Sequence, residues 1–199
     1  MISGYFGLPG CGKTTFLASI AQKELRRIKK GKSKYKKVYT NFWCDGCLRI
    51  DYKHLGNFDI SDALILLDEI TLDADSRNFK QFDEAHKYFF LLHRHYNCDL
   101  IYFTQFYDGV DKKIRDITNI LWHVKRVGPF SIARQIFRIL DINEQTKEIV
   151  QGYRFSNFFE LLFLHPFRIC YRPLWYKYFD SFERKELPEF KDHKWSDRA

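Results

Sequence analysis

A glycine-rich segment near the start of the chain constrains the fold more than any other feature. It reads Gly-Leu-Pro-Gly-Cys-Gly-Lys-Thr from Gly7 to Thr14 and matches the pattern G-x-x-x-x-G-K-T. Tyr5 and Phe6 end a short apolar stretch before it, and apolar residues recur at helical spacing after it. A strand, a phosphate-binding loop and a helix are therefore expected in that order.

The residue types of this loop suit the binding of a polyphosphate. Glycine reaches backbone conformations that turn successive N–H groups inward, toward an anion. Lys13 can reach the β- and γ-phosphates, and the hydroxyl of Thr14 can ligate Mg²⁺. The helix that begins there points the positive end of its dipole at the same phosphates. ATP with Mg²⁺ is therefore the expected ligand.

A second segment ends in two adjacent carboxylates. Residues 63–67 are an uninterrupted apolar run, followed by Asp68 and Glu69. Such a run is typical of a buried parallel strand, whose carboxyl end faces the nucleotide. We expect Asp68 to organise the Mg²⁺ shell and Glu69 to act as general base on the attacking water, whereas an isolated pair of this kind can equally be a solvated strand end. The residues expected to bind ATP are Gly7, Pro9, Gly10, Cys11, Gly12, Lys13, Thr14, Thr15 and Asp68, and those expected to hold the metal are Thr14 and Asp68.

A third apolar run, Asp99 to Thr104, is followed by Gln105. In a parallel sheet its carboxyl end points at the same crevice, so Gln105 is expected to sense the γ-phosphate or to help position the water. A polar residue that merely closes a strand is the alternative.

The order of these motifs resembles that in zonula-occludens-toxin-like proteins, the assembly ATPases of filamentous phages within the FtsK–HerA class of P-loop motors. The resemblance covers residues 1–127 and implies a cytoplasmic ATPase that acts as an oligomer, expected as a ring, and drives export or packaging of a phage genome. The segments that carry it are Asp68-Glu69, Asp75-Ser76-Arg77, His93-Arg94-His95, Asp99, Thr104-Gln105 and Asp111-Lys112-Lys113-Ile114-Arg115.

The resemblance leaves the biological setting open. Many filamentous-phage members continue into a transmembrane helix, whereas no apolar run here approaches the ~18–20 residues that a span needs. A truncated chain and a short relative from another virus or mobile element are both consistent with this, as are filament extrusion and capsid packaging. A small phosphotransferase and a nucleotide-dependent assembly scaffold without catalysis are the alternative functions.

Motors of the resembled class need an arginine supplied across a subunit interface. Arg94 and Arg77 are expected ahead of Arg115, and an ordinary surface arginine is the alternative for each. Arg94 ends an expected helix and lies off its apolar stripe. That stripe is expected to consist of Phe82, Ala85, Phe89 and Leu92.

Charge suggests a second anionic partner. The chain carries a net charge of +8, and Lys23 to Lys37 contains nine Lys and Arg residues against one acid, Glu24. Basic residues favour a helix C-terminus, which accounts for the first few of them. The remainder predicts contact with viral DNA or another polyanion, and peripheral contact with anionic lipid is left open.

The expected fold is a single α/β P-loop domain with a mostly parallel central sheet. A late antiparallel hairpin is expected from Ile132–Ile142 through a turn at residues 143–146 into Ile149, so the ATPase domain is placed at 1–152. Residues 153–199 are rich in aromatics and arginine and are expected to form a C-terminal arm and tail. The arm's rings either cover the core or a neighbouring subunit, or anchor the chain at a membrane interface.

Five cysteines without a leader sequence indicate reduced thiols. Cys44 and Cys47 form a single C-x-x-C, for which a turn containing Gly46 is the simplest interpretation, and half of a zinc site is the alternative.

Overall fold

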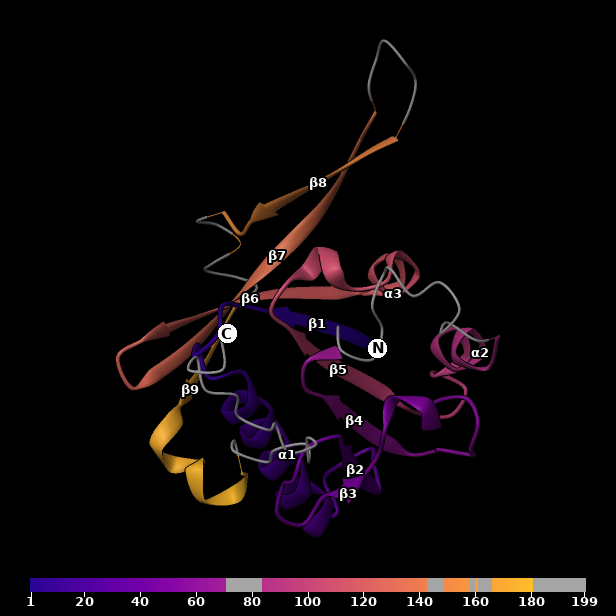
Figure 1. Ribbon diagram of the computed structural model, residues 1–199, viewed down its shortest axis with the longest axis vertical. Coiled ribbons are helices and arrows are strands. Elements are labelled where there is room, and N and C mark those ends of the chain that lie inside the picture. Colours follow the sequence, from indigo (N-terminus) through magenta and orange to yellow (C-terminus); the bar gives the residue numbers. More distant parts are fainter. Residues whose placement is uncertain (71–83, 143–148, 158–159, 161–165, 181–199) are drawn as a thin grey trace, which may run out of the picture.

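The computed structural model describes residues 1–70, 84–142, 149–157, 160 and 166–180. They form one central sheet with helices on both faces (Figure 1). The helix α1 (Lys13–Lys29) lies on one face, together with the short turns near the end of the chain, whereas α2 (Glu84–Leu92) and α3 (Lys112–Ile117) lie on the other. The predicted α/β class is confirmed.

The sheet is parallel over its first six strands and antiparallel beyond them. Its order is β3-β2-β4-β5-β1-β6-β7-β8, and β9 also pairs with β7. The parallel strands in this order are β3 (Leu48–Arg49), β2 (Lys37–Thr40), β4 (Ala63–Leu67), β5 (Asp99–Thr104), β1 (Ile2–Phe6) and β6 (Ile120–Val127). The antiparallel strands are β7 (Phe130–Ile142), β8 (Ile149–Phe155) and β9 (Phe167–Tyr171). The mostly parallel sheet and the late hairpin, here β7–β8, are as predicted.

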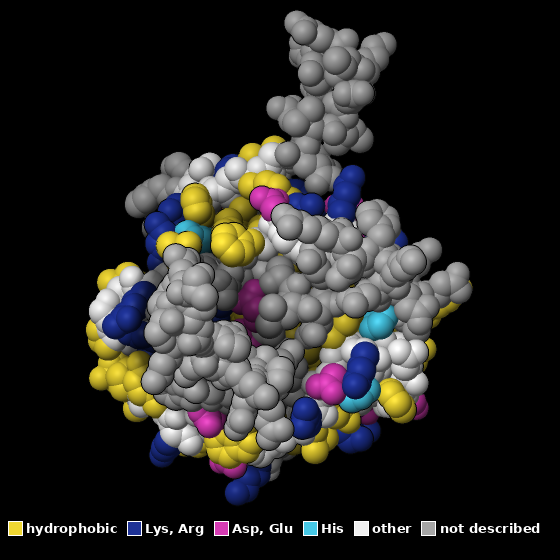
Figure 2. Space-filling model, in the orientation of Figure 1, with side chains coloured by type: hydrophobic (Ala, Val, Ile, Leu, Met, Phe, Trp, Pro, Cys, Tyr) yellow, Lys and Arg dark blue, Asp and Glu magenta, His cyan; other side chains and the backbone are white. Residues whose placement is uncertain are grey.

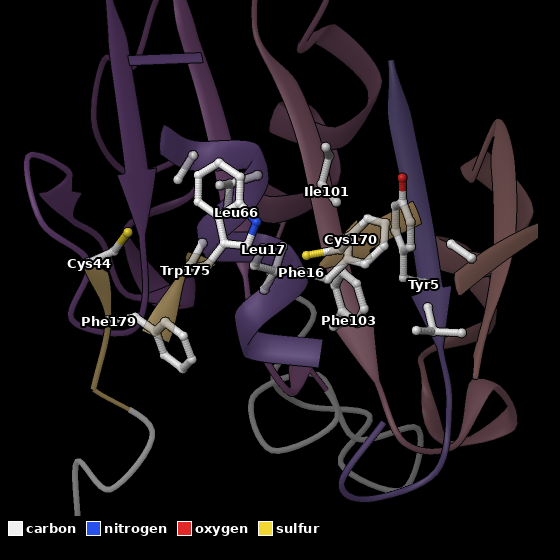
Figure 3. Packing of buried hydrophobic residues seen from close by; sticks show 14 of the residues in the cluster. Tyr5, Phe16, Leu17, Cys44, Leu66, Ile101, Phe103, Cys170, Trp175 and Phe179 are labelled. Carbon is white, nitrogen blue, oxygen red and sulfur yellow. The ribbon is translucent and has the colours of Figure 1, made fainter. Parts of the chain in front are cut away.

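The α1 face of the sheet is packed with aromatic rings. Tyr5 of β1 stacks on Phe103 at 4.7 Å and on Trp122 at 5.7 Å between ring centroids. Trp175 and Phe179, which follow β9, are buried in the same cluster and close it against α1 (Figure 3). These two rings of the C-terminal arm therefore cover the core, which is one of the two roles expected for the arm.

The other face of the sheet is covered by α2 and α3, and the expected apolar stripe of α2 is partly wrong. Phe89 and Phe90 are buried, and His86 and His93 lie on the same side at helical spacing. Leu92, which the sequence placed inward, is 36% exposed. Histidine counts as polar in a hydrophobicity pattern. The two buried histidines, His86 and His93, therefore hid from the sequence analysis which side of α2 faces the sheet. Phe82 lies outside the described residues.

The strand β9 extends the sheet where the sequence predicted only an arm. It pairs antiparallel with β7, from Phe130 opposite Tyr171 to Arg134 opposite Phe167. The strand β8 continues past residue 152, where the ATPase domain was expected to end and the arm to follow from residue 153. Among the helices that the structure describes, none is both long and apolar enough to cross a membrane.

The start of β5 anchors the chain that leaves α1. The carboxylate of Asp99 accepts hydrogen bonds from the ammonium groups of Lys34, at 2.8 Å, and Met1, and from the hydroxyl of Tyr35. Burial acts to raise the pKa of Asp99, but these donors outweigh it and lower the pKa to about 2. Ionised Asp99 therefore stabilises the fold by tying three segments together.

Because the pKa of Asp99 falls on folding, its stabilisation is present above about pH 4 and is lost as the pH falls toward about 2. The Asp99→Asn variant is expected to be less stable than the wild type by about 2 kcal/mol at pH 6, with the difference shrinking on acidification. Urea denaturation at several pH values measures this. Asp108→Asn, at an exposed carboxylate, is the control. A constant difference between Asp99→Asn and wild type across this range would contradict the assignment.

Candidate functional site

The glycine-rich loop joins β1 to α1, as predicted. Gly10 and Gly12 adopt left-handed backbone conformations, with φ of 76° and 85°. Gly12 is the N-cap of α1, where no side chain caps the helix and no acidic residue stands in the first turn. The N–H groups at this helix start are therefore available to an anion, which the helix dipole also favours.

Lys13, Thr14 and Thr15 form the first turn of α1, so the loop motif and the helix coincide. The ammonium of Lys13 donates to the carbonyl oxygen of Gly7 at 3.3 Å, which folds the side chain back along the loop. Thr15 and Cys11 are buried, whereas Pro9 and Gly10 form the exposed tip. Burial raises the pKa of the Cys11 thiol, although the Lys13 ammonium partly opposes this.

Asp68 meets the loop from the end of β4. The hydroxyl of Thr14 donates to its carboxylate at 2.5 Å, so the two residues assigned to the metal lie together. Burial raises the pKa of Asp68, and the Thr14 hydroxyl and the Lys13 ammonium act in the opposite direction. A cation beside this carboxylate would relieve the cost of burying its charge. A hydroxyl and a carboxylate are also the hard oxygen donors that Mg²⁺ takes beside phosphate oxygens, so the residues present fit this ion.

Asn41, which the sequence analysis did not single out, fixes the backbone of Asp68. Its side-chain amide donates to the Asp68 carbonyl at 2.8 Å and accepts from the Asp68 N–H at 2.7 Å. Asn41 follows β2, the neighbour of β4 in the sheet. A polar residue after a strand is a common pattern, and only the pairing of β2 with β4 makes it informative.

The Asn41→Ala variant is expected to lower the free energy of unfolding by about 1–3 kcal/mol, since it leaves two backbone groups of Asp68 without their partners. It should also weaken the binding of Mg²⁺ beside Asp68. Thermal unfolding and a Mg²⁺ titration measure the two effects. Asn57→Ala, which removes an exposed amide bonded to the Lys53 carbonyl, is the matched control. Equal Mg²⁺ curves for Asn41→Ala and wild type would refute the positioning role.

Glu69 and Gln105 lie side by side at the ends of adjacent strands, β4 and β5. The backbone N–H of Gln105 donates to the Glu69 carboxylate at 3.3 Å. Glu69 has a φ of 49°, a left-handed conformation that is unusual for a residue with a side chain. Strain of this kind gathers at sites where the surroundings impose it, and here it turns the carboxylate toward the end of β5.

The loop rests on residues from the far end of the chain. The hydroxyl of Ser131 donates to the Cys11 carbonyl at 2.6 Å. The Arg172 guanidinium donates to the Gly128 carbonyl at 2.6 Å, and its Cδ lies 2.7 Å from the position that a Cβ on Gly12 would take. The P-loop is therefore held in place by two segments distant in the sequence. These are the β6–β7 turn with the start of β7, and the turn after β9. Neither residue belongs to a local motif, so the sequence analysis missed both.

Neither Arg94 nor Arg115 joins this site within the chain. Arg94 is exposed and precedes β5, so it lies at the edge of the sheet where the strands begin, opposite the P-loop. Arg115 forms an ion pair with Asp108 at 2.9 Å. Arg77 lies outside the described residues. If Arg94 contacts a γ-phosphate, the nucleotide must be bound to a neighbouring subunit. This role of Arg94 remains a prediction.

The basic segment Lys23–Lys37 lies at the end of α1 that is farthest from the P-loop, a helix length of roughly 25 Å away. Part of it is engaged within the chain: Arg26 lies over the Trp175 ring, 5.6 Å from its centroid, and Lys36 pairs with Asp62 at 2.6 Å. The exposed members include Lys29, Lys30, Lys32 and Lys37.

Cys44 and Cys47 flank the predicted turn, in which Gly46 has a φ of 74°. A hydrogen bond between the two thiols lowers the pKa of Cys44 and raises that of Cys47. Among the described residues, no third His, Cys, Asp or Glu joins them in a metal-binding group.

Comparison with known proteins gives a family. A family model described as "Zonular occludens toxin (Zot)" matches residues 15–155, which extends beyond residue 127 and includes Asp68, Glu69 and Gln105. A search of curated proteins finds no match.

Two solved structures are similar in fold. The N-terminal domain of zonular occludens toxin from Neisseria meningitidis shares 16% identity at a TM-score of 0.47, covering 79% of this chain and 94% of that one. The genome packaging NTPase B204 from Sulfolobus turreted icosahedral virus 2, in complex with ATP-gammaS, shares 10% identity at a TM-score of 0.46, covering 76% and 96%. The family match spans more than half of the sequence and confirms the resemblance inferred from the motifs: the chain belongs to the zonular occludens toxin family.

Proposed function

We propose that this chain is a Mg²⁺-dependent ATPase that works as an oligomer and powers assembly, export or genome packaging for a phage or mobile element. One observation carries the ATPase proposal. The Thr14 hydroxyl and the Asp68 carboxylate lie 2.5 Å apart beside an uncapped helix N-terminus, with Glu69 next in the chain. Groups that can bind phosphate, bind a metal and act as a base therefore lie together at the carboxyl ends of β1 and β4.

The roles of the residues follow from their positions. The loop N–H groups and Lys13 bind the phosphates, and Thr14 and Asp68 would hold Mg²⁺, which neutralises charge on the phosphate oxygens when bound. Glu69 accepts a proton from the water that attacks the γ-phosphorus, and ADP is the leaving group. Gln105, whose N–H holds the Glu69 carboxylate, keeps that base aimed at the crevice.

The decisive experiment measures phosphate release from ATP by the purified chain, with Mg²⁺ and with EDTA, and with and without candidate phosphate acceptors. Mg²⁺-dependent release without an acceptor is the expected result. Acceptor-dependent transfer would identify a phosphotransferase instead. ATP binding without any release would favour the scaffold alternative.

The oligomer and its polyanion are further parts of the proposal. A ring seen with a bound ATP analogue would show which of Arg94, Arg77 and Arg115 reaches a neighbour's γ-phosphate. Viral DNA is the polyanion that we propose for the basic segment, because the family resemblance implies a genome and the segment's exposed lysines suit phosphate groups.

A further inference from the structure

The face of the sheet that α2 and α3 cover continues, beyond β1, onto the strands β6 to β9. In register, Phe130 of β7 lies opposite Val127 of β6 and Tyr171 of β9, so their side chains share this side. We name the alternate positions of β6–β9 that share the side of Phe130 the extension face. Five aromatic residues on it are exposed: Phe130, Tyr153, Phe155, Phe167 and Tyr171. Exposed aromatic rings gathered on one face make it a candidate binding surface.

Cations are placed among these rings, and acids are absent from the strand positions described there. Lys125 of β6, Arg134 of β7 and Arg138 of β7 share the extension face by register. The Arg134 guanidinium lies over the Phe155 ring at 4.6 Å and over the Phe167 ring at 5.8 Å. None of the described strand positions on this face carries Asp or Glu. Figure 2 shows hydrophobic side chains beside Lys and Arg side chains where the hairpin leaves the body, with acidic side chains of other segments close by.

The extension face also reaches the nucleotide loop. His123 contacts the Phe155 ring at 6.0 Å and the Phe6 ring at 5.0 Å between centroids. Phe6 directly precedes Gly7, the first residue of the P-loop. A ligand on the extension face therefore lies next to the nucleotide site, whereas the basic segment Lys23–Lys37 lies at the far end of α1.

We infer that the extension face binds single-stranded nucleic acid. Unpaired bases stack on its rings, and the backbone phosphates lie on its cations, Lys125, Arg134 and Arg138. This inference rests on the proposed function, whose polyanion it identifies as unpaired. Aromatic rings on an open sheet stack only on bases that are not already stacked within a duplex. Lys125 also lies on this face, and lysine is depleted in the core of protein interfaces but suits contact with a phosphate backbone. The chemistry therefore favours a polyanion with accessible rings.

The test is fluorescence anisotropy of a labelled thymidine oligonucleotide, compared with a duplex, in the absence of nucleotide. Tyr171→Ala and Tyr153→Ala are each expected to weaken single-strand binding at least about fivefold, the effect of losing one stacked base. Tyr171→Phe should restore it, because the ring is kept. Tyr176→Ala is the matched control, since Tyr176 is equally exposed but follows β9 on the α1 side.

Salt dependence tests the charged part of the face. Lys125→Ala is expected to reduce the slope of log affinity against log salt by about 0.7, the value for one contact with single-stranded phosphate. Lys53→Ala is the control and should leave the slope of this single-strand binding unchanged, because Lys53 is exposed and follows β3 at the opposite edge of the sheet.

Three outcomes would overturn the inference. The first is equal affinity of the wild type for duplex and single strand. The second is a Tyr171→Ala variant whose sedimentation changes while its oligonucleotide affinity does not. The third is a Tyr171→Ala variant that loses binding to anionic vesicles while its oligonucleotide affinity does not change. The second would identify a second copy of the chain as occupant, and the third a membrane surface. Failure here leaves ATP hydrolysis intact. A wild type that binds the oligonucleotide through Tyr171 yet releases no phosphate would instead refute the proposed function alone.

Discussion

Replacing Glu69 with Gln is expected to slow ATP hydrolysis by at least about a hundredfold while ATP still binds. Glutamine has nearly the same shape as glutamate and can keep an oxygen toward the Gln105 N–H, now 3.3 Å from the carboxylate. It cannot accept the proton of the attacking water. The loss therefore falls on kcat and leaves nucleotide affinity close to that of the wild type.

Steady-state phosphate release and calorimetric titration with ATP measure the two quantities separately. Glu160→Gln is the control, because Glu160 pairs with Arg154 in the hairpin, away from the loop, and its loss should leave the rate unchanged. A Glu69→Gln variant that turns over ATP at the wild-type rate would show that another group serves as base.

Replacing Gly7 with Ala is expected to lower the free energy of unfolding by about 1–3 kcal/mol and to weaken ATP binding. A Cβ at this position would lie 2.5 Å from the Val124 carbonyl oxygen and 2.9 Å from the Cys11 sulfur. The nearer atom belongs to the backbone of β6, which cannot move aside without disturbing the sheet. The end of β1 and the loop after it must shift instead, and the loop N–H groups lose their common direction.

Gly10→Ala provides the comparison for this prediction. Gly10 has nothing within 4 Å of an added Cβ, so its substitution carries only the cost of a left-handed alanine, about 1 kcal/mol. Thermal unfolding and ATP titration of both variants separate close packing from backbone strain. If Gly7→Ala proved no worse than Gly10→Ala, the close approach of β1 to Val124 would not limit the loop.

The sequence predicted the parts of the site that are local. The loop from Gly7 to Thr14 carries its own spacing, and the apolar run before Asp68 is typical of a strand buried on both sides. Their meeting, at 2.5 Å between Thr14 and Asp68, follows from parallel strands ending at one edge. Such motifs need no knowledge of distant contacts.

The parts that the sequence did not predict depend on contacts between distant residues. Asn41 acquires its role only because β2 pairs with β4, and Ser131 only because the β6–β7 turn passes beneath the loop. The strand β9 alternates too briefly to be distinguished from an aromatic arm, and its partner β7 was expected to pair only in the hairpin. His86 and His93 are buried although histidine is polar, so the hydrophobic pattern of α2 gave the wrong inward side.

The support that Arg172 gives to Gly12 has a consequence for how the protein is made. Gly12 precedes Arg172 in the sequence by 172 − 12 = 160 residues, so the loop leaves the ribosome well before the side chain that packs against it. Contacts between such distant positions form late, because the intervening chain must first be ordered. A nascent chain that does not yet include Arg172 therefore lacks the contact that supports Gly12, and its loop is held less firmly.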